Sequence, residues 1–282
     1  SYGYTGNLIA EQAVREGLRP LLAGRDETRL RAQAQRLSLD FRVIPLSDAS
    51  ALDEALRATG LVVHCAGPFV LTWRKMVEAC LRTGAHYVDI SGEIEEFEAV
   101  AEFNEKAKDA GIMLLPGAGF DVVPSDCLAA HVKRCLPSAT NLKLFIYSVG
   151  GGISRGTARS GIENAQRQGR IRRGGKIVTV WPAWNVLERD FGRGLVKTAS
   201  IGWGDVSTSY YSTGIPNVEV YMAFRPEAIN FLKVMRVIGP LMYNRPVKRF
   251  LQWFLRFSPA GPSEERRTKG FVLMLAEASD GV

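Results

Sequence analysis

The sequence is poor in the residues that build disulfide frameworks and metal centres. It has four cysteines and three histidines among 282 residues. The cysteines form no C-x-x-C pair and no disulfide-like spacing, which favours a reducing compartment, and we expect a cytoplasmic protein. The histidines lie far apart and match no metal motif, so a structural role is favoured for each, and we expect no metal.

Internal repeats and low-complexity segments are also missing, and a broad basic surface is not indicated. The net charge of +7 is concentrated in residues 225–269, which hold ten Lys/Arg and three Asp/Glu, whereas the rest of the chain holds 26 of each sign. A nucleic-acid-binding protein would more often need a wider basic face or a known module, so we expect no nucleic-acid partner. The hydrophobic content of 46% is that of a globular protein with one or two domains.

The opening stretch, "SYGYTGNLIAEQAVREG", places two glycines before an expected helix. Apolar residues at helical spacing predict this helix over Asn7–Glu16. Gly3 and Gly6 then precede a helix N-terminus, where backbone N–H groups favour an anion. They make two thirds of a G-x-x-G-x-x-G phosphate loop, whose first glycine and preceding strand we expect upstream of Ser1. An ordinary loop leading into a helix is the alternative.

The first 135 residues alternate short apolar runs with amphipathic stretches. A regular strand–helix alternation with apolar strands predicts a parallel sheet covered on both faces. Together with the missing first strand it makes six strands, which is an α/β, doubly wound Rossmann fold over residues 1–137. The expected strands are 18–24, 41–46, 60–69, 85–93 and 111–121. The expected helices are 25–37 (N-cap Asp26), 48–58 (Ser50 and Asp53 in capping-box register), 71–84, one carrying Phe97, Val100, Phe103, Ala107 and Ala110, and one after Pro124.

The pattern changes after Pro137. Strand-like stretches follow one another without helices between them, except for a glycine-rich helix around Thr157 and Ser160. This predicts a second, α+β domain over 138–282 with a mixed or antiparallel sheet, serving substrate binding or oligomerisation. The last stretch, "KGFVLMLAEASDGV", begins a strand and stops, so we expect this end to be cut as well.

The loops after the expected strands predict a cofactor. NAD enzymes usually place an acid at the tip of the second strand, but Arg25 stands here, and a guanidinium suits a 2′-phosphate. Asp26 is the competing candidate, although an N-cap role explains it. We therefore expect NADP rather than NAD. The predicted cofactor-binding residues are Gly3, Tyr4, Thr5, Gly6, Gly24, Arg25, Ala66, Gly67, Pro68 and Phe69.

The sequence holds no Ser-Tyr-x-x-x-Lys arrangement, so the proton donor must be sought elsewhere. The stretch "GFDVVPSD" follows the last expected strand and offers Asp121 as a catalytic candidate. Capping by Ser125 or Asp126 and bracing by Asp121 are the structural alternatives. The same two alternatives, a catalytic or a structural role, apply to four residues at another strand tip, namely Tyr87, Asp89, Ser91 and Glu93. The predicted substrate-cleft residues are Gly119, Phe120, Ser125, Thr157 and Ser160.

Six ordered stretches resemble the saccharopine dehydrogenase-like oxidoreductase family, and its trans-acting enoyl reductase-like branch in particular. The resemblance implies a Rossmann domain, a saccharopine-dehydrogenase-like second domain, an active site in the cleft between them and a nicotinamide cofactor. The stretches are "GYTGNLIAE", "LAGRDETRL", "VVHCAGPF", "GAHYVDISGE", "PGAGFDVVPSD" and "GPSEERR".

The expected function is hydride transfer between NADP and a hydrophobic, lipid-like enoyl or acyl substrate. The alternatives are a catalytically silent dinucleotide-binding scaffold and a saccharopine dehydrogenase-type amino-acid oxidoreductase. The branch makes a lipid-like substrate plausible, and so does a basic amphipathic segment over 228–257. Two interpretations of this segment remain open. In the first, its apolar face is buried against the second domain or against a partner subunit in a homodimer. In the second, the face contacts an anionic membrane or the substrate. The face consists of Val247, Phe250, Leu251, Phe254 and Leu255.

Overall fold

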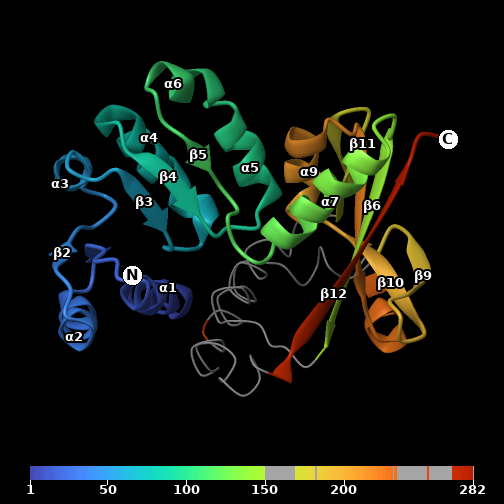
Figure 1. The fold of residues 1–282 in the computed structure, drawn as a ribbon, viewed down its shortest axis with the longest axis horizontal. Coiled ribbons are helices and arrows are strands. Elements are labelled where there is room, and N and C mark those ends of the chain that lie inside the picture. Colours follow the sequence, from blue (N-terminus) through green and yellow to red (C-terminus); the bar gives the residue numbers. More distant parts are fainter. Residues whose placement is uncertain (150–168, 182, 231, 234–252, 254–268, 282) are drawn as a thin grey trace. The chain divides into compact units, whose positions relative to one another are not determined.

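The computed structural model describes residues 1–149, 169–181, 183–230, 232–233, 253 and 269–281. The chain divides into two compact units, unit 1 (Ser1–Gly119) and unit 2 (Phe120–Val282) (Figure 1). The predicted helix around Thr157 and Ser160 lies outside the described residues, as does nearly all of the basic segment after residue 233.

Unit 1 alternates strands and helices as predicted, and both of its sheets are parallel. One sheet pairs β1 with β2, and the other has the order β3-β4-β5. The strands are β1 (Leu22–Gly24), β2 (Phe41–Val43), β3 (Leu61–His64), β4 (His86–Asp89) and β5 (Leu114–Leu115). The helices are α1 (Tyr4–Arg15), α2 (Glu27–Leu37), α3 (Ala49–Leu56), the 3-10 turn η1 (Phe69–Leu71), α4 (Trp73–Thr83), α5 (Ile94–Ala101) and α6 (Asn104–Asp109).

Neither β1 nor β3 pairs with a second neighbour among the described residues, so each leaves one edge of its sheet open. Leu61 and Val63 of β3 are 48% and 44% exposed. This face of β3 is therefore only partly covered by the described residues.

Local capping chemistry sets several helix boundaries. Asp26 caps α2 as predicted, accepting from Arg29 N at 3.1 Å. The cap of α3 is Asp48, which accepts from Ala51 N at 3.0 Å, so the predicted capping box starting at Ser50 is wrong. Because Asp48 comes earlier in the chain, Ser50 already lies inside the helix.

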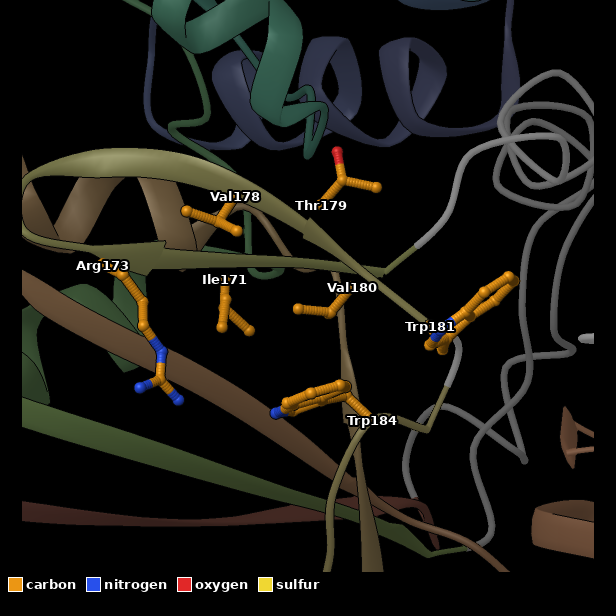
Figure 2. Close-up of a pocket in the computed structure, with 7 residues that line it drawn as sticks. All are labelled: Ile171, Arg173, Val178, Thr179, Val180, Trp181 and Trp184. Carbon is orange, nitrogen blue, oxygen red and sulfur yellow. The ribbon is translucent and has the colours of Figure 1, made fainter.

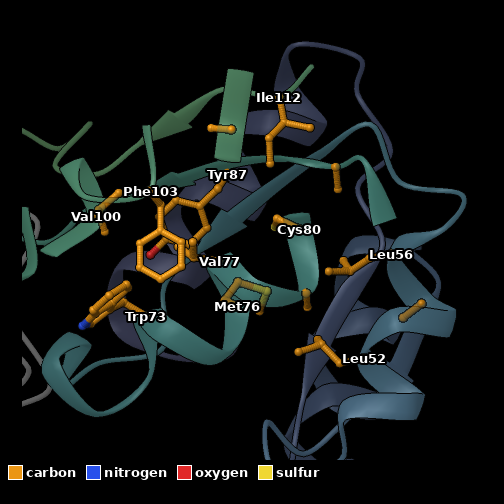
Figure 3. Packing of buried hydrophobic residues seen from close by; sticks show 14 of the residues in the cluster. Leu52, Leu56, Trp73, Met76, Val77, Cys80, Tyr87, Val100, Phe103 and Ile112 are labelled. Carbon is orange, nitrogen blue, oxygen red and sulfur yellow. The ribbon is translucent and has the colours of Figure 1, made fainter. Parts of the chain in front are cut away.

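The core of unit 1 packs α3, α4, α5 and α6 around β4 (Figure 3). Trp73 and Phe103 meet edge to face, with ring centroids 6.0 Å apart. The single helix predicted through Phe103 is instead two helices, α5 and α6, and Phe103 is the N-cap of the second. The break turns Ala110, which the continuous stripe would bury, toward solvent.

Unit 2 is built on a mixed sheet with the order β12-β6-β11-β10-β9, and β7 pairs with both β11 and β8. Of the strand pairs formed by the described residues of unit 2, β6–β11 is parallel and the others are antiparallel, so the predicted mixed character is confirmed. The helices are α7 (Val123–Cys135) and α9 (Asp205–Thr213). The strands are β6 (Asn141–Val149), β7 (Gly169–Arg173), β8 (Lys176–Val180), β9 (Val186–Asp190), β10 (Leu195–Ile201), β11 (Asn217–Ala223) and β12 (Phe271–Ser279).

Two features of unit 2 differ from the sequence analysis. Residues 205–213, which lie in the run of strands expected to contain no further helix, form α9, which ends at Gly214 with φ 70°. Helix α7, assigned above to the first domain, packs against α9, β6 and β12 and belongs to unit 2. It begins at Val123, so Pro124 lies inside its first turn rather than before it.

Candidate cofactor site and polar clusters

The N-terminus of α1 offers a site for an anion. Gly3, its N-cap, makes no side-chain cap hydrogen bond, and the first turn holds no acidic residue. Asn7 N is the donor to Gly3 O at 2.8 Å, so the earlier N–H groups of the turn are not used inside the helix. A Cβ on Gly3 would meet no atom within 4 Å. Backbone donors beside open space fit the pyrophosphate of a dinucleotide.

Gly6 and Gly24 let three chain segments come together. Gly6 lies within the first turn of α1, not before the helix as predicted, because the helix starts at Tyr4. A Cβ on Gly6 would stand 2.5 Å from Ser1 O and 3.3 Å from Cys65 Cβ, just after β3. A Cβ on Gly24, at the end of β1, would stand 2.6 Å from the ring of Tyr2. The start of α1 therefore contacts the carboxyl ends of both β1 and β3, where doubly wound folds bind ligands.

Arg25 follows β1 directly and is exposed. No hydrogen bond or ion pair joins it to another described residue. Arg29 lies one helical turn further on, 5.8 Å from the centroid of the Tyr2 ring and 3.5 Å from Asp26 Oδ2. Two guanidinium groups thus lie near the end of β1, and the carboxylate of Asp26 is engaged as the cap of α2. These side chains fit a 2′-phosphate better than a ribose diol.

The loop Ala66–Phe69 after β3 is fixed by side chains from two directions. Thr72 Oγ1 donates to Ala66 O at 2.7 Å and lies 3.1 Å from Nε2 of the buried His64. Burial lowers the pKa of His64 to about 4, so the imidazole is neutral at pH 7. On the other side, Val70 N donates to Glu93 Oε2 at 3.1 Å.

Asp89, the last residue of β4, holds the loop that follows β5. Its Oδ1 accepts from Ser91 N (2.9 Å), Ser91 Oγ (2.9 Å) and Gly117 N (2.7 Å). Its Oδ2 accepts from Tyr87 Oη at 2.5 Å, and its backbone carbonyl accepts from Ala118 N at 2.8 Å. Asp89 and Glu93 therefore brace two loops at the carboxyl edge of the sheet. This is the structural role that the sequence left open for them.

Glu96 on α5 is a buried acid of a different kind. It is 1% exposed, and neither carboxyl oxygen has a hydrogen-bond partner of acceptable geometry among the described residues. Burial, and next the negative charge of Asp89, raise the pKa of Glu96 to about 11, so this side chain is a neutral acid at pH 7. The sequence analysis missed it, although position 96 falls on the same helical stripe as Val100 and Phe103.

In unit 2, the catalytic candidate Asp121 is exposed, as is the neighbouring Phe120. The indole Nε1 of Trp203 donates to Asp121 O at 2.7 Å, which fixes the backbone of this loop. Desolvation raises the pKa of the Asp121 carboxyl group above its usual value. A role for Asp121 in proton transfer stays a prediction.

Neither Ser125 nor Asp126 caps α7, whose N-cap makes no side-chain hydrogen bond. The cap of α7 is Val122, and Ser125 Oγ donates to Val122 O at 3.0 Å. Asp126 Oδ1 accepts from Ser212 Oγ of α9 at 2.9 Å. On α9, Asp205 is fully buried with both carboxyl oxygens unpartnered among the described residues. Burial raises its pKa to about 7.

The structure thus brings together the start of α1 and the ends of β1 and β3, which carry most of the predicted cofactor-binding residues. Gly119 closes unit 1, and its Cβ position lies 3.4 Å from Ile90 Cβ, beside the residue that follows Asp89. Thr157 and Ser160 lie outside the described residues. Asp205 had no signal in the sequence, because the stretch around it was read as strand.

Comparison with known proteins gives one family and several relatives. Residues 2–115 match the family described as "Saccharopine dehydrogenase NADP binding domain". A human protein named saccharopine dehydrogenase-like oxidoreductase is 26% identical over 196 residues, covering 61% of this chain and 46% of that protein. A Mycobacterium tuberculosis protein named as a candidate trans-acting enoyl reductase is 31% identical over 174 residues, covering 57% of this chain and 42% of that protein.

Among solved structures, the fold is similar to that of saccharopine dehydrogenase (L-Glu forming) from Saccharomyces cerevisiae. The TM-score is 0.62 at 15% identity, covering 86% of this chain and 57% of that chain. At this identity the likeness concerns the fold. The match to each of the two curated relatives spans less than half of the relative's length.

Proposed function

We propose that this chain, whose residues 2–115 match the saccharopine dehydrogenase NADP-binding domain family, acts in hydride transfer between NADP and a hydrophobic acyl-type substrate. The observation that carries the proposal is the junction of the uncapped α1 N-terminus with the ends of β1 and β3. This junction combines backbone donors, open space at Gly3 and an exposed arginine after β1.

Each part of the cofactor has candidate partners in unit 1. The N–H groups at the start of α1 bind the pyrophosphate, and Arg25 pairs with the 2′-phosphate. The loop Ala66–Phe69 lines the ribose on the nicotinamide side. Glu93 and Asp89 contribute indirectly, because they hold this loop and the loop after β5 in place.

When bound, NADPH would supply the hydride or NADP⁺ would accept it, so the protein has to orient the substrate and donate one proton in the first direction or accept one in the second. Asp121 is the proposed donor, since desolvation raises the pKa of its carboxyl group and Trp203 fixes the backbone of its loop. Asp205 is fully buried behind the same loop region of unit 2, so we assign it no direct contact with substrate.

Two observations bear on the class of substrate. The name of the mycobacterial relative suggests an enoyl compound. Phe120, beside Asp121, is 64% exposed, which offers an apolar surface at the proposed donor. A contact of residues 228–257 with a membrane or a second subunit remains part of the proposal, but most of this segment lies outside the described residues. In the described part of the chain, no helix has the length and apolarity to span a membrane.

The test is cofactor binding by the protein, followed by turnover. Isothermal titration should show tighter binding of NADPH than of NADH, and Arg25→Ala should reduce that preference by about tenfold or more, because a charge-assisted contact to phosphate contributes about 1.5–3 kcal/mol. Arg57→Ala, which removes an exposed arginine at the C-cap of α3, is the matched control and should leave the preference unchanged.

Turnover is then sought by following NADPH absorbance with enoyl and acyl thioesters of increasing chain length. Oxidation of NADPH that depends on an acyl substrate, and that falls in Asp121→Asn with unchanged NADPH binding, supports the reaction. Equal affinity for the two cofactors, or no loss of preference in Arg25→Ala, would refute the cofactor assignment. Tight NADPH binding without any turnover would favour the catalytically silent scaffold.

A further inference from the structure

Unit 2 contains a hollow that the proposed reaction does not use. It lies beside the β7–β8 hairpin, has a volume of about 390 Å³ and falls in the size range of small-molecule sites (Figure 2). Ile171, Val178 and Val180 form an apolar wall on the hairpin, and Trp181 and Trp184 supply two indole rings. Both tryptophans are half exposed, at 51% and 50%.

The wall is held rigidly because alternate residues of β7 face opposite ways. Ile171 and Arg173 line the hollow, whereas Arg172 between them is buried on the other side. Arg172 Nε donates to Val206 O at 2.9 Å, and its guanidinium carbon lies 4.3 Å from the ring centroid of Tyr210. These contacts fasten the hairpin to α9, so the hollow exists before any ligand arrives.

The charge of the hairpin selects the kind of ligand. Residues 169–180 contain four cationic side chains and no acidic one. Arg173, whose side chain is 58% exposed, donates from Nη2 to Glu219 Oε1 at 3.1 Å and makes no other hydrogen bond to a described residue. Its remaining N–H groups are therefore available to an anion at the rim of an apolar hollow.

Figure 2 shows Ile171, Val180 and Arg173 projecting from the hairpin toward the side on which Trp184 lies, whereas Thr179 projects to the other side. The apolar surface is thus concave and faced by an indole, which suits one molecule enclosed between two walls better than a flat lipid surface.

We propose that this hollow binds a single apolar carboxylate, with its hydrocarbon part between the hairpin wall and Trp184 and its carboxylate on Arg173. The site goes beyond the hydride transfer proposed above and does not depend on it, since binding here requires neither NADP nor turnover.

The experiment measures binding of decanoate, decanol and 2-naphthoate to the purified protein below the concentrations at which they aggregate. Isothermal titration gives the affinity, and quenching of tryptophan fluorescence reports the location, because two of the five tryptophans line the hollow. We expect saturable, one-to-one binding of at least one of the two carboxylates. The preference between decanoate and 2-naphthoate distinguishes an aliphatic from an aromatic ligand.

The variants separate the two halves of the site. Arg173→Gln should weaken carboxylate binding by about tenfold and leave decanol within about twofold. Trp184→Ala should weaken all ligands that bind by about tenfold, and Trp184→Phe replaces it if the alanine variant fails to fold. Arg193→Gln, which removes an exposed charge from the β9–β10 turn, should bind like the wild type.

Three results would overturn the proposal. They are the absence of saturable binding of either carboxylate, an equal loss of affinity in Arg193→Gln and Arg173→Gln, and co-sedimentation with phosphatidylglycerol vesicles without any binding of monomeric ligand. The last result would make the tryptophans part of a membrane-contacting surface instead.

Discussion

Replacing Glu96 with glutamine should stabilise unit 1 increasingly as the pH rises. The wild-type side chain is buried beside Asp89, and its pKa of about 11 keeps it protonated in the folded state. Glutamine has the shape of the protonated acid and cannot ionise. The substitution therefore preserves the packing of α5 and removes one titrating group from both the folded and the unfolded chain.

The size of the effect follows from linkage between proton binding and folding. In the unfolded chain the pKa of Glu96 returns to the ordinary value of 4.5, so unfolding at pH 7 releases its proton. Its contribution to stability is fully present below pH 4.5 and is lost as the pH rises toward 11. The free energy of unfolding of the wild type should fall by up to about 1.4 kcal/mol per pH unit relative to Glu96→Gln, or about 2.8 kcal/mol between pH 7 and 9.

Urea unfolding at pH 7, 8 and 9 checks this expectation. Hydrogen exchange of peptides from α5 and β4 assigns the transition to unit 1, and the difference between wild type and variant cancels the groups that titrate in both. Glu102→Gln, which changes an exposed glutamate at the C-cap of α5, should give a difference that does not vary with pH. Parallel pH profiles for the wild type and Glu96→Gln would show that Glu96 is ionised in the folded protein and refute the reasoning.

Three further predictions concern other parts of the chain. Gly6→Ala should destabilise unit 1 and abolish NADPH binding, because the new Cβ would stand 2.5 Å from Ser1 O. Gly3→Ala, whose Cβ would meet no atom within 4 Å, should still fold. Thermal unfolding and NADPH titration compare the two variants. Val63→Lys should slow aggregation of the chain from Ser1 to Val282, measured by light scattering, because it places a charge on β3, which pairs on one side only among the described residues. Asp205→Asn should gain stability over the wild type as the pH rises from about 4 to about 7 and hold that gain above it, measured by melting at pH 5, 6, 7 and 8, because burial raises the pKa of this carboxyl group to about 7.

The alternation of unit 1 could be predicted because its signals are local. Apolar runs of strand length, an aspartate at an N-cap and a glycine at φ 78° after α4 each act within a few residues. The features that could not be predicted depend on a choice between two possible capping residues or on contacts between distant parts of the chain. Two residues, Asp48 and Ser50, could both cap α3, and the earlier one does. The helix α9 has a sequence of strand-forming residues, but its packing against α7 and β11 outweighs that preference.

The candidate site residues likewise include some with a local sequence signal and some that only tertiary packing brings together. Gly3, Gly6 and Arg25 could be predicted as cofactor-binding residues because phosphate recognition uses a short motif at a helix start and a charge at a strand end. Glu96 was overlooked because an acid on a helix is normally solvated, although its spacing from Val100 put it on the buried stripe. The sequence says which way that carboxyl group faces, but not that Asp89 lies beside it, because Asp89 comes from a strand whose distance from α5 is set only by packing. Glu96 keeps its proton because packing buries it and places it next to Asp89, and this pairing exists only in the folded unit. The pH dependence of the free energy of unfolding therefore measures that packing directly.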